Sequence, residues 1–321
     1  MFKFSSIYLL AALSTLMVNP AQARPQTFVA SFGNDANPCG RVLPCRLLAR
    51  AIDLTDTNGE VTVLDSANYD PITITKSISI TAPPGIYAGI AVPSDDISGV
   101  TINANGINVV LRGLTITGNS QDDGTLNSLS AGILMTAGAK LSIENCVISN
   151  FSSINSNNLQ PGVLVQTPAT VRMVNTITRN NEIGALFQAG AKAHISKSKF
   201  LGNSVYGIYA FNETAGSTTT AAISNTVVLG SGVGIYSRAI TPTASSKIDI
   251  SRSIVSNAGI GVAAESSTGV TATVSIRKSM VTGSSTGLAK IFDGTMISYG
   301  NNTLSNNISD LGGTLTPAAP L

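Results

Sequence analysis

A glycine followed by an apolar residue recurs along much of the chain, and this repeat constrains the fold more than any other feature. The repeat glycines, which are 22 to 30 residues apart, are Gly132, Gly162, Gly184, Gly207, Gly234, Gly261 and Gly287. A recurring period in this range is the sequence signature of stacked repeat architectures. We therefore expect each repeat to form one structural unit of a single domain.

The second half of each unit is equally regular. An apolar strand pattern is followed by a polar residue, a small residue and a second apolar pair, as in Leu141–Asn150. The small residues are Cys146, Thr176, Ser198, Thr226, Ser253 and Ser279. Small side chains at one repeated position are expected where a tight turn joins two sheets.

Units of this size cannot bury an apolar face alone, whereas stacked units bury a continuous one. The composition, with 43% hydrophobic and 11% charged residues, excludes a disordered chain. An antiparallel sandwich or a propeller would need hairpin turns such as Asn-Gly or Asp-Gly, which are scarce here. The sequence therefore predicts an all-β chain that forms a single parallel β-helix, a solenoid.

The two ends of a solenoid need to be covered. Pro44–Asp53 has apolar residues at helical spacing and predicts a short amphipathic helix that caps the N-terminal coil. We expect an N-terminal cap over residues 24–60, coils over 61–304 and a C-terminal cap or tail over 305–321.

Residues 1–23 have the pattern of a signal peptide. Lys3 precedes an apolar run, Ile7–Val18, and Ala21-Gln22-Ala23 is an A-x-A cleavage site. The run is too short for a typical transmembrane helix, and no later segment reaches about 18 apolar residues. We expect an exported protein, periplasmic or extracellular and of bacterial type, with no membrane span after cleavage.

Three cysteines bear on this expectation. Cys39 and Cys45 flank a five-residue segment, and an oxidising compartment would favour a disulfide between them. Metal binding is the alternative, but His194 is the one histidine and no second ligand pair appears, so we expect no metal site. Cys146 lies in a strand pattern and is expected to be a buried small residue.

Charge is distributed unevenly along the chain. Residues 24–131 contain six basic and ten acidic residues, whereas residues 132–321 contain twelve basic and seven acidic ones. The basic second half suits an anionic partner such as an acidic glycan. Its charges are too dispersed for nucleic acid, because no Lys or Arg cluster is dense enough to follow a phosphate backbone.

Several segments outside the glycine repeat are characteristic, and they are Phe28–Ser31, Asn37–Cys39, Pro44–Arg46, Leu64-Asp65 and Tyr69–Lys76. In these segments and in the repeat, the sequence resembles the secreted right-handed β-helix proteins of the pectin-lyase-like superfamily. The resemblance covers essentially the whole mature chain and implies a right-handed helix. It implies no single activity, because the superfamily includes lyases, hydrolases, esterases, epimerases and proteins without known activity.

The motifs of the uronate-acting members are not matched. Of the carboxylates that polygalacturonase-like hydrolases use, only the Asp-Asp pair has a near match in this chain, Asp122-Asp123. The Asp-Phe-Ile-Phe-Gly segment of pectinesterase-like enzymes is missing. A pectate-type lyase would need a nest of carboxylates for Ca²⁺ beside an Arg or Lys base, whereas the acids after Gly132 are scattered over different coils. No cofactor is expected, with Ca²⁺ as the exception if the chain is a lyase.

Stacking brings His194 and Arg172 onto neighbouring coils and leaves Asp249 two coils from His194, roughly 10 Å away. That separation is too large for a hydrogen-bonded His–Asp pair, so a solvated histidine on a sheet face is the simpler interpretation. The catalytic residues are therefore unknown, and Asp122, Asp123, His194 and Arg172 are the candidates.

The strand after each repeat glycine indicates a different site. The residue directly after the glycine is apolar and is expected to face the core, so alternation turns both the glycine and the second residue after it outward. The outward column then includes Leu164, Leu186, Tyr209 and Tyr236, an exposed apolar ladder that is a candidate glycan or partner groove. The alternatives are a parity shifted by one residue, or long turns that fold over the column.

Two hypotheses about function follow. The first is an exported, non-catalytic β-helix that binds a polysaccharide, possibly acidic, or another cell-envelope component. The second is a polysaccharide lyase or glycoside hydrolase with a non-standard active site. The sparse carboxylates and the lone histidine favour the first, and the sequence leaves the oligomeric state open.

Overall fold

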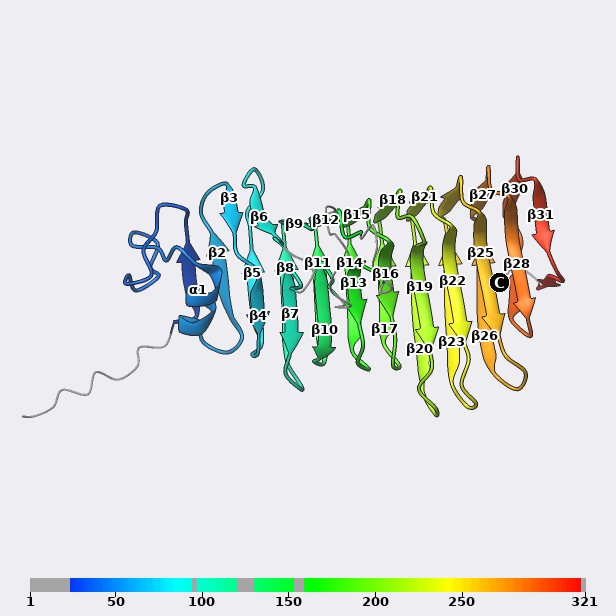
Figure 1. Cartoon of the computed structure of the whole chain (residues 1–321), viewed down its shortest axis with the longest axis horizontal. Helices are drawn as coiled ribbons and strands as arrows, with labels where there is room; N and C mark the ends of the chain where they lie inside the picture. Colours follow the sequence, from blue (N-terminus) through cyan, green and yellow to red (C-terminus); the bar gives the residue numbers. More distant parts are fainter. Residues whose placement is uncertain (1–23, 94–96, 120–129, 153–158, 319–321) are drawn as a thin grey trace, which may run out of the picture.

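The computed structural model describes residues 24–93, 97–119, 130–152 and 159–318. The chain winds through three parallel sheets, one of 12 strands and two of 10 strands, and forms an elongated β-helix (Figure 1). Each coil passes through the 12-stranded sheet A, then sheet B, then sheet C, before it returns to sheet A one strand further along. The all-β solenoid expected from the repeat is confirmed.

Sheet A runs the full length of the solenoid. Its strands are β1 (Gln26–Val29), β2 (Gly59–Val63), β5 (Ile78–Thr81), β8 (Asn108–Arg112), β11 (Lys140–Glu144), β14 (Thr170–Val174), β17 (Lys192–Ser196), β20 (Thr218–Ser224), β23 (Ser245–Ser251), β26 (Thr271–Arg277), β29 (Thr295–Ser298) and β32 (Thr316–Pro317). Inward and outward residues alternate along these strands, so one residue in two faces the core.

Sheet B is made of the shorter strands that follow the turn after sheet A. They are β3 (Ala67–Tyr69), β6 (Ala88–Ala91), β9 (Leu114–Thr117), β12 (Val147–Ser149), β15 (Ile177–Arg179), β18 (Lys199–Leu201), β21 (Val227–Leu229), β24 (Ile254–Ser256), β27 (Met280–Thr282) and β30 (Thr303–Ser305). The middle residue of most of these strands is buried in the core, as Phe200 and Val228 are.

Sheet C contains the strands that begin near the repeat glycines. They are β4 (Ile72–Ile74), β7 (Val100–Asn103), β10 (Ile133–Ala137), β13 (Pro161–Val165), β16 (Ile183–Phe187), β19 (Tyr206–Asn212), β22 (Val233–Ala239), β25 (Ile260–Ser266), β28 (Thr286–Phe292) and β31 (Ser309–Gly312). The apolar residue after each repeat glycine is buried, as expected, in the column Ile133, Val163, Ala185, Ile208, Ile235, Val262 and Leu288.

The repeat glycines point toward the core, so their expected outward orientation is wrong. A Cβ on Gly207 would lie 2.4 Å from the carbonyl oxygen of Gly234 and 2.5 Å from a Cγ of buried Val228. Gly207 and Ile208 therefore both face inward, and strict alternation begins only after them. The glycine is required because the chain bends from sheet B to sheet C where neighbouring coils approach too closely for any side chain.

The column of small residues forms the turn between sheets A and B, as expected. All six are buried. The Thr176 hydroxyl donates to the carbonyl of Val174 at 3.1 Å, and the amide of Thr226 donates to the Ser253 hydroxyl of the next coil at 3.2 Å. These side chains therefore satisfy backbone groups that the turn removes from the sheets.

The N-terminal cap contains the helix α1 (Leu48–Leu54), which buries Leu48, Ala51 and Ile52 against the first coils. The helix begins later than the expected Pro44 because Cys45 is extended and exchanges backbone hydrogen bonds with β1. The expected disulfide between Cys39 and Cys45 is present, with Cα atoms 4.6 Å apart. Strand pairing also exceeds the expected coil limits at both ends, because β1 pairs with β2, and β31 and β32 lie beyond Leu304.

Candidate functional site

The outer face of sheet A is strongly basic. Along β8 to β26 it carries six Lys or Arg side chains and two acidic ones. The basic residues are Arg112, Lys140, Arg172, Lys192, Lys247 and Arg277, and the acidic ones are Glu144 and Asp249. The sequence predicted a basic second half, and the parallel register concentrates part of that charge on one face.

A shallow groove of about 440 Å³ crosses this face. Arg172 and His194 line one end, and Asp249 and Arg277 line the other, with exposed Ala222 and half-buried Ser224 between them. Arg172 and Arg277 lie four strand spacings apart, roughly 19 Å, because the strands stack at about 4.8 Å. The groove is therefore long enough for a segment of a polymer.

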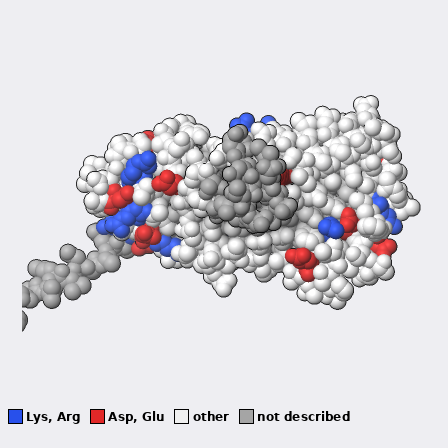
Figure 2. All heavy atoms as spheres, in the orientation of Figure 1, with Lys and Arg blue, Asp and Glu red and all other residues white. Residues whose placement is uncertain are grey.

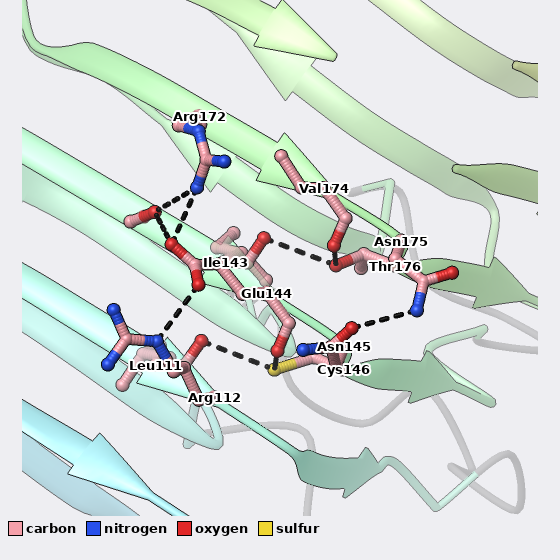
Figure 3. A network of polar contacts seen from close by, with 11 residues as sticks. Leu111, Arg112, Ile143, Glu144, Asn145, Cys146, Arg172, Val174, Asn175 and Thr176 are labelled. Carbon is pink, nitrogen blue, oxygen red and sulfur yellow. Dashed lines mark hydrogen bonds and ion pairs between the residues drawn. The ribbon is translucent and has the colours of Figure 1, made fainter. Parts of the chain in front are cut away.

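Glu144 lies between two arginines beside the groove (Figure 3). Its carboxylate accepts from Arg112 Nε at 2.9 Å and from Arg172 Nη1 at 2.6 Å, and Ser142 also donates to it at 2.8 Å. The hydrogen bond from Arg112, aided by Ser142 and the charge of both arginines, holds the pKa of Glu144 below its usual range. Glu144 is therefore an anion at neutral pH, and the two positive charges of Arg112 and Arg172 exceed its single negative charge.

The catalytic candidates Arg172 and His194 are direct neighbours in the register of β14 and β17, as expected. Ala222 separates His194 from Asp249, so the imidazole and the carboxylate are two strands apart. Both side chains are exposed. The arrangement offers a proton carrier and a carboxylate along one groove, but it does not form a hydrogen-bonded pair.

Cations also occupy the turn between sheets A and B. The residues that follow β11, β14, β17, β20, β23 and β26 have positive φ between 47° and 56°, and they are Asn145, Asn175, Lys197, Asn225, Arg252 and Lys278. Asn175 donates to the Asn145 amide oxygen at 2.8 Å (Figure 3). Asparagine tolerates this left-handed conformation, whereas lysine and arginine are strained in it. All six are exposed, so the three cations extend the basic face.

The ladder predicted on sheet C points outward, away from the helix core, as expected. It contributes to a second apolar cluster on that face, which includes Leu164, Leu186, Tyr209, Tyr236 and Ala263. The expected exposure is wrong, because Leu164 is 1% exposed and each of the two tyrosines is 6% exposed. The rings of Tyr209 and Tyr236 stack at 4.9 Å, and those of Tyr206 and Tyr236 lie 5.4 Å apart.

Charged groups complete this cluster. The Tyr236 hydroxyl donates to Glu265, which also accepts from Arg238 Nε at 2.8 Å. Burial raises the pKa of Tyr209 to about 12, and burial together with the Glu265 carboxylate raises that of Tyr236. The face of sheet C seen in Figure 2 is otherwise mostly uncharged over its described surface. The tyrosines pack the sheet and offer little ring surface to a ligand.

The remaining predicted residues do not add to the groove. Asp122 and Asp123 lie outside the described residues. Cys146 is buried, and burial raises the pKa of its thiol to about 11, as expected for a packing residue. Within the described ranges, no three His, Cys, Asp or Glu side chains gather, so these residues do not fit the carboxylate nest of a Ca²⁺-dependent lyase.

The expected signal peptide, residues 1–23, also lies outside the described part of the chain. Of the helices in the described residues, none is long and apolar enough to cross a bilayer.

Sequence reasoning missed the three lysines on the outer face of sheet A, the face that also carries the groove. Lys140, Lys192 and Lys247 occupy a column one step before the column that contains Arg172 and His194. Comparing the residues two positions before Ser142, His194 and Asp249 in their strands would have revealed the three lysines.

Comparison with known proteins agrees with this architecture. The chain is similar to the crystal structure of pectate lyase Pel9A, with 14% identity and a TM-score of 0.54 over 92% of this chain and 77% of that one. It is also similar to a GH136 lacto-N-biosidase from Eubacterium ramulus, with 9% identity and a TM-score of 0.52 over 92% and 68% of the two chains. No curated protein sequence matches.

These low identities support the fold alone. Residues 98–309, more than half of the chain, match the family described as right-handed beta helix region. The stacked sheets and this match together show that the chain belongs to the right-handed β-helix family.

Proposed function

We propose that this chain is an exported β-helix protein that binds an acidic polysaccharide along the outer face of sheet A. The observation that carries the proposal is the groove beside Arg172 and Arg277, on a face with six basic and two acidic side chains. A surface with an excess of one sign of charge attracts ligands of the opposite charge.

The extent of the basic face favours a polymer over a small molecule. Six of the seven strands from β8 to β26 carry the charges, and the seven strands extend over roughly 29 Å along the solenoid. Most of these side chains are solvent-exposed, and each surface ion pair contributes at most about 1 kcal/mol. A ligand must therefore contact several of them at once, as a chain of charged sugars does.

Export is part of the proposal. It is supported by the signal-peptide pattern in residues 1–23 and agrees with the Cys39–Cys45 disulfide, since such bonds persist in oxidising compartments.

Catalysis is the second candidate. The groove contains His194 and Asp249 about two strand spacings apart, and a lyase or hydrolase would need a proton carrier in this position. Glu144, the other nearby carboxylate, is held between two arginines and is a poor proton carrier. Binding without cleavage accounts for the groove with fewer assumptions.

The test is affinity electrophoresis of the purified protein in gels that contain polygalacturonate, hyaluronate or a neutral glucan. We expect retardation by the polyanions, none by the glucan, and weaker retardation in Lys192→Glu/Lys247→Glu. The matched control is Lys199→Glu/Arg179→Glu, which changes the charge of sheet B by the same amount. Equal retardation of both variants would refute the site on sheet A.

The same samples separate binding from catalysis. New reducing ends, or an unsaturated product that absorbs in the ultraviolet, would establish a hydrolase or a lyase. His194→Ala and Asp249→Asn would then be expected to abolish that activity, and unchanged polysaccharide after prolonged incubation supports binding alone.

A further inference from the structure

Lysine and an uncharged residue alternate along one column of the outer face of sheet A. The parallel register aligns Asn108, Lys140, Thr170, Lys192, Thr220, Lys247 and Thr273 on successive strands. We call this set the lysine column. Its three lysines are exposed, and Thr170 also lines the groove.

The register fixes the distance between the charges. Neighbouring strands lie about 4.8 Å apart, so lysines on every second strand are separated by roughly 9.6 Å. The rise of one sugar in an extended glycan is close to one strand spacing. Two strands therefore correspond to a disaccharide.

The side chains between the lysines are hydroxyls. Thr170 and Thr220 can donate to and accept from sugar hydroxyls, whereas the lysine ammonium groups favour carboxylates or sulfates. Alternation along the column thus offers an uncharged and a cationic contact in turn.

The neighbouring column does not fill the gaps with free positive charge. Arg172 lies on the same strand as Thr170, but its guanidinium is paired with Glu144 at 2.6 Å. Ala222 lies on the same strand as Thr220 and carries no charge. The two-strand period of the lysine column is therefore retained between Lys140 and Lys247, and Arg277 adds a cation on the next strand, β26.

We propose that the bound polysaccharide has a disaccharide repeat in which one sugar is anionic and the other is neutral. This inference rests on the proposed function, because it specifies the polymer that the basic face of sheet A binds. It makes a homopolymer with a carboxylate on every sugar the less favoured ligand, since any of its carboxylates that faces the sheet between two lysines would lie against threonine.

A structural explanation of the alternation makes a different prediction. Like charges on directly neighbouring strands destabilise a sheet, so spacing the lysines would also favour folding. In that case, moving one lysine along the column to a strand that still has no lysine neighbour would leave the choice of polymer unchanged.

The experiment compares hyaluronate oligosaccharides, which carry a carboxylate on every second sugar, with oligogalacturonates of equal carboxylate number. Calorimetry gives both dissociation constants for the full chain and for Lys247→Thr/Thr273→Lys. This exchange keeps the net charge and brings no two lysines of the column onto neighbouring strands, but it replaces one two-strand interval by three. Lys140→Thr/Asn108→Lys does the same at the other end. The matched control is Lys199→Thr/Thr115→Lys, which moves a lysine by three strands within sheet B.

We expect tighter binding of the alternating oligosaccharide and a loss of about fivefold in each exchange variant, the scale of one surface charge contact. The homopolymer should lose less than twofold, and Lys199→Thr/Thr115→Lys should bind as the parent does. Tighter binding of the homopolymer, or equal binding of both with no effect of either exchange, would overturn the alternating ligand while leaving the proposed function intact. Failure of every polyanion to bind would overturn both.

Discussion

Lys197, Arg252 and Lys278 adopt a backbone conformation that favours asparagine or glycine. The equivalent positions in three other coils carry asparagine, so the turn itself does not require a cation. Strained residues persist where the surrounding structure and function maintain them. The strain at these positions is consistent with a role for the three cations in ligand binding.

Substitution of one of these cations separates stability from binding. Left-handed backbone costs an L-residue about 1–2 kcal/mol, and asparagine avoids part of this cost, so we predict that Lys278→Asn raises the free energy of unfolding by roughly 0.5–1 kcal/mol. The same variant should be less retarded by polyanions. Urea denaturation and affinity electrophoresis measure the two effects, and a gain in both stability and affinity would contradict the assignment.

Glu144 gives a second prediction at the level of a single residue. Its pKa in the folded chain lies below the ordinary value of 4.5, so its contribution to stability is present above pH 4.5 and is lost as the pH falls through the folded-state pKa. Glu144→Gln should remove this part of the acid dependence. The change is expected to be small, at most about 1 kcal/mol, because the arginine partners are exposed.

Binding provides the clearer measurement for the same variant. Glu144→Gln releases both arginines from their shared anion, so retardation by polyanions at pH 7 should increase. Ser142→Ala, which removes only the hydroxyl that donates to Glu144, serves as the control. Weaker retardation of Glu144→Gln would show that the carboxylate positions the arginines for the ligand.

At the level of elements, the repeat glycines set the bend between sheets B and C. Gly207→Ala places a methyl group within 2.5 Å of two core atoms, and we predict a loss of about 1–3 kcal/mol in the free energy of unfolding, as in overpacked cores. Gly40→Ala is the matched control, because a Cβ there has no neighbour within 4 Å. Thermal denaturation of the two variants tests the difference, and equal stability would contradict the close approach of the coils.

The disulfide gives a prediction for the N-terminal cap. Cys45 pairs with Val29 and hydrogen-bonds to Phe28 and Ala30, so the short loop that the disulfide closes is built around β1. For a loop of this size the chain-entropy model gives about 2 kcal/mol, and Cys39→Ser/Cys45→Ser should lose about that much stability. Reduction of the parent protein should lower its unfolding temperature in calorimetry as much as the double substitution does. Reduction should also destabilise Cys146→Ser, which keeps the disulfide, and should leave the stability of the double variant unchanged.

Much of the element arrangement was predictable because it follows from the repeat. The column from Cys146 to Ser279 and the disulfide were placed correctly, since turns and short loops depend on local residues. The orientation of the repeat glycines was predicted incorrectly, because the alternation of inward and outward residues fails where Gly207 and Ile208 both face inward. The burial of Tyr209 was also missed, since it depends on Tyr206, Tyr236 and other neighbours from adjacent coils.

For the whole molecule, the proposed binding along the basic face predicts that affinity depends on ligand length. We predict that binding of an acidic oligosaccharide strengthens with length until it spans β8 to β26, roughly 29 Å, and then levels off. Raising the salt concentration should weaken binding at every length, because the Debye length falls from about 10 Å at 0.1 M to about 3 Å at 1 M. Calorimetry over a size series checks both, and affinity independent of length would restrict the site to the groove alone.

The parallel register of sheet A converts position along the chain into position along the solenoid axis. Gain or loss of a single coil between two lysines of the lysine column would change their separation from an even to an odd number of strands. Only the duplication or deletion of coils in pairs would preserve the charge period. Variation in the length of this surface during evolution is thus expected to proceed in steps of two coils.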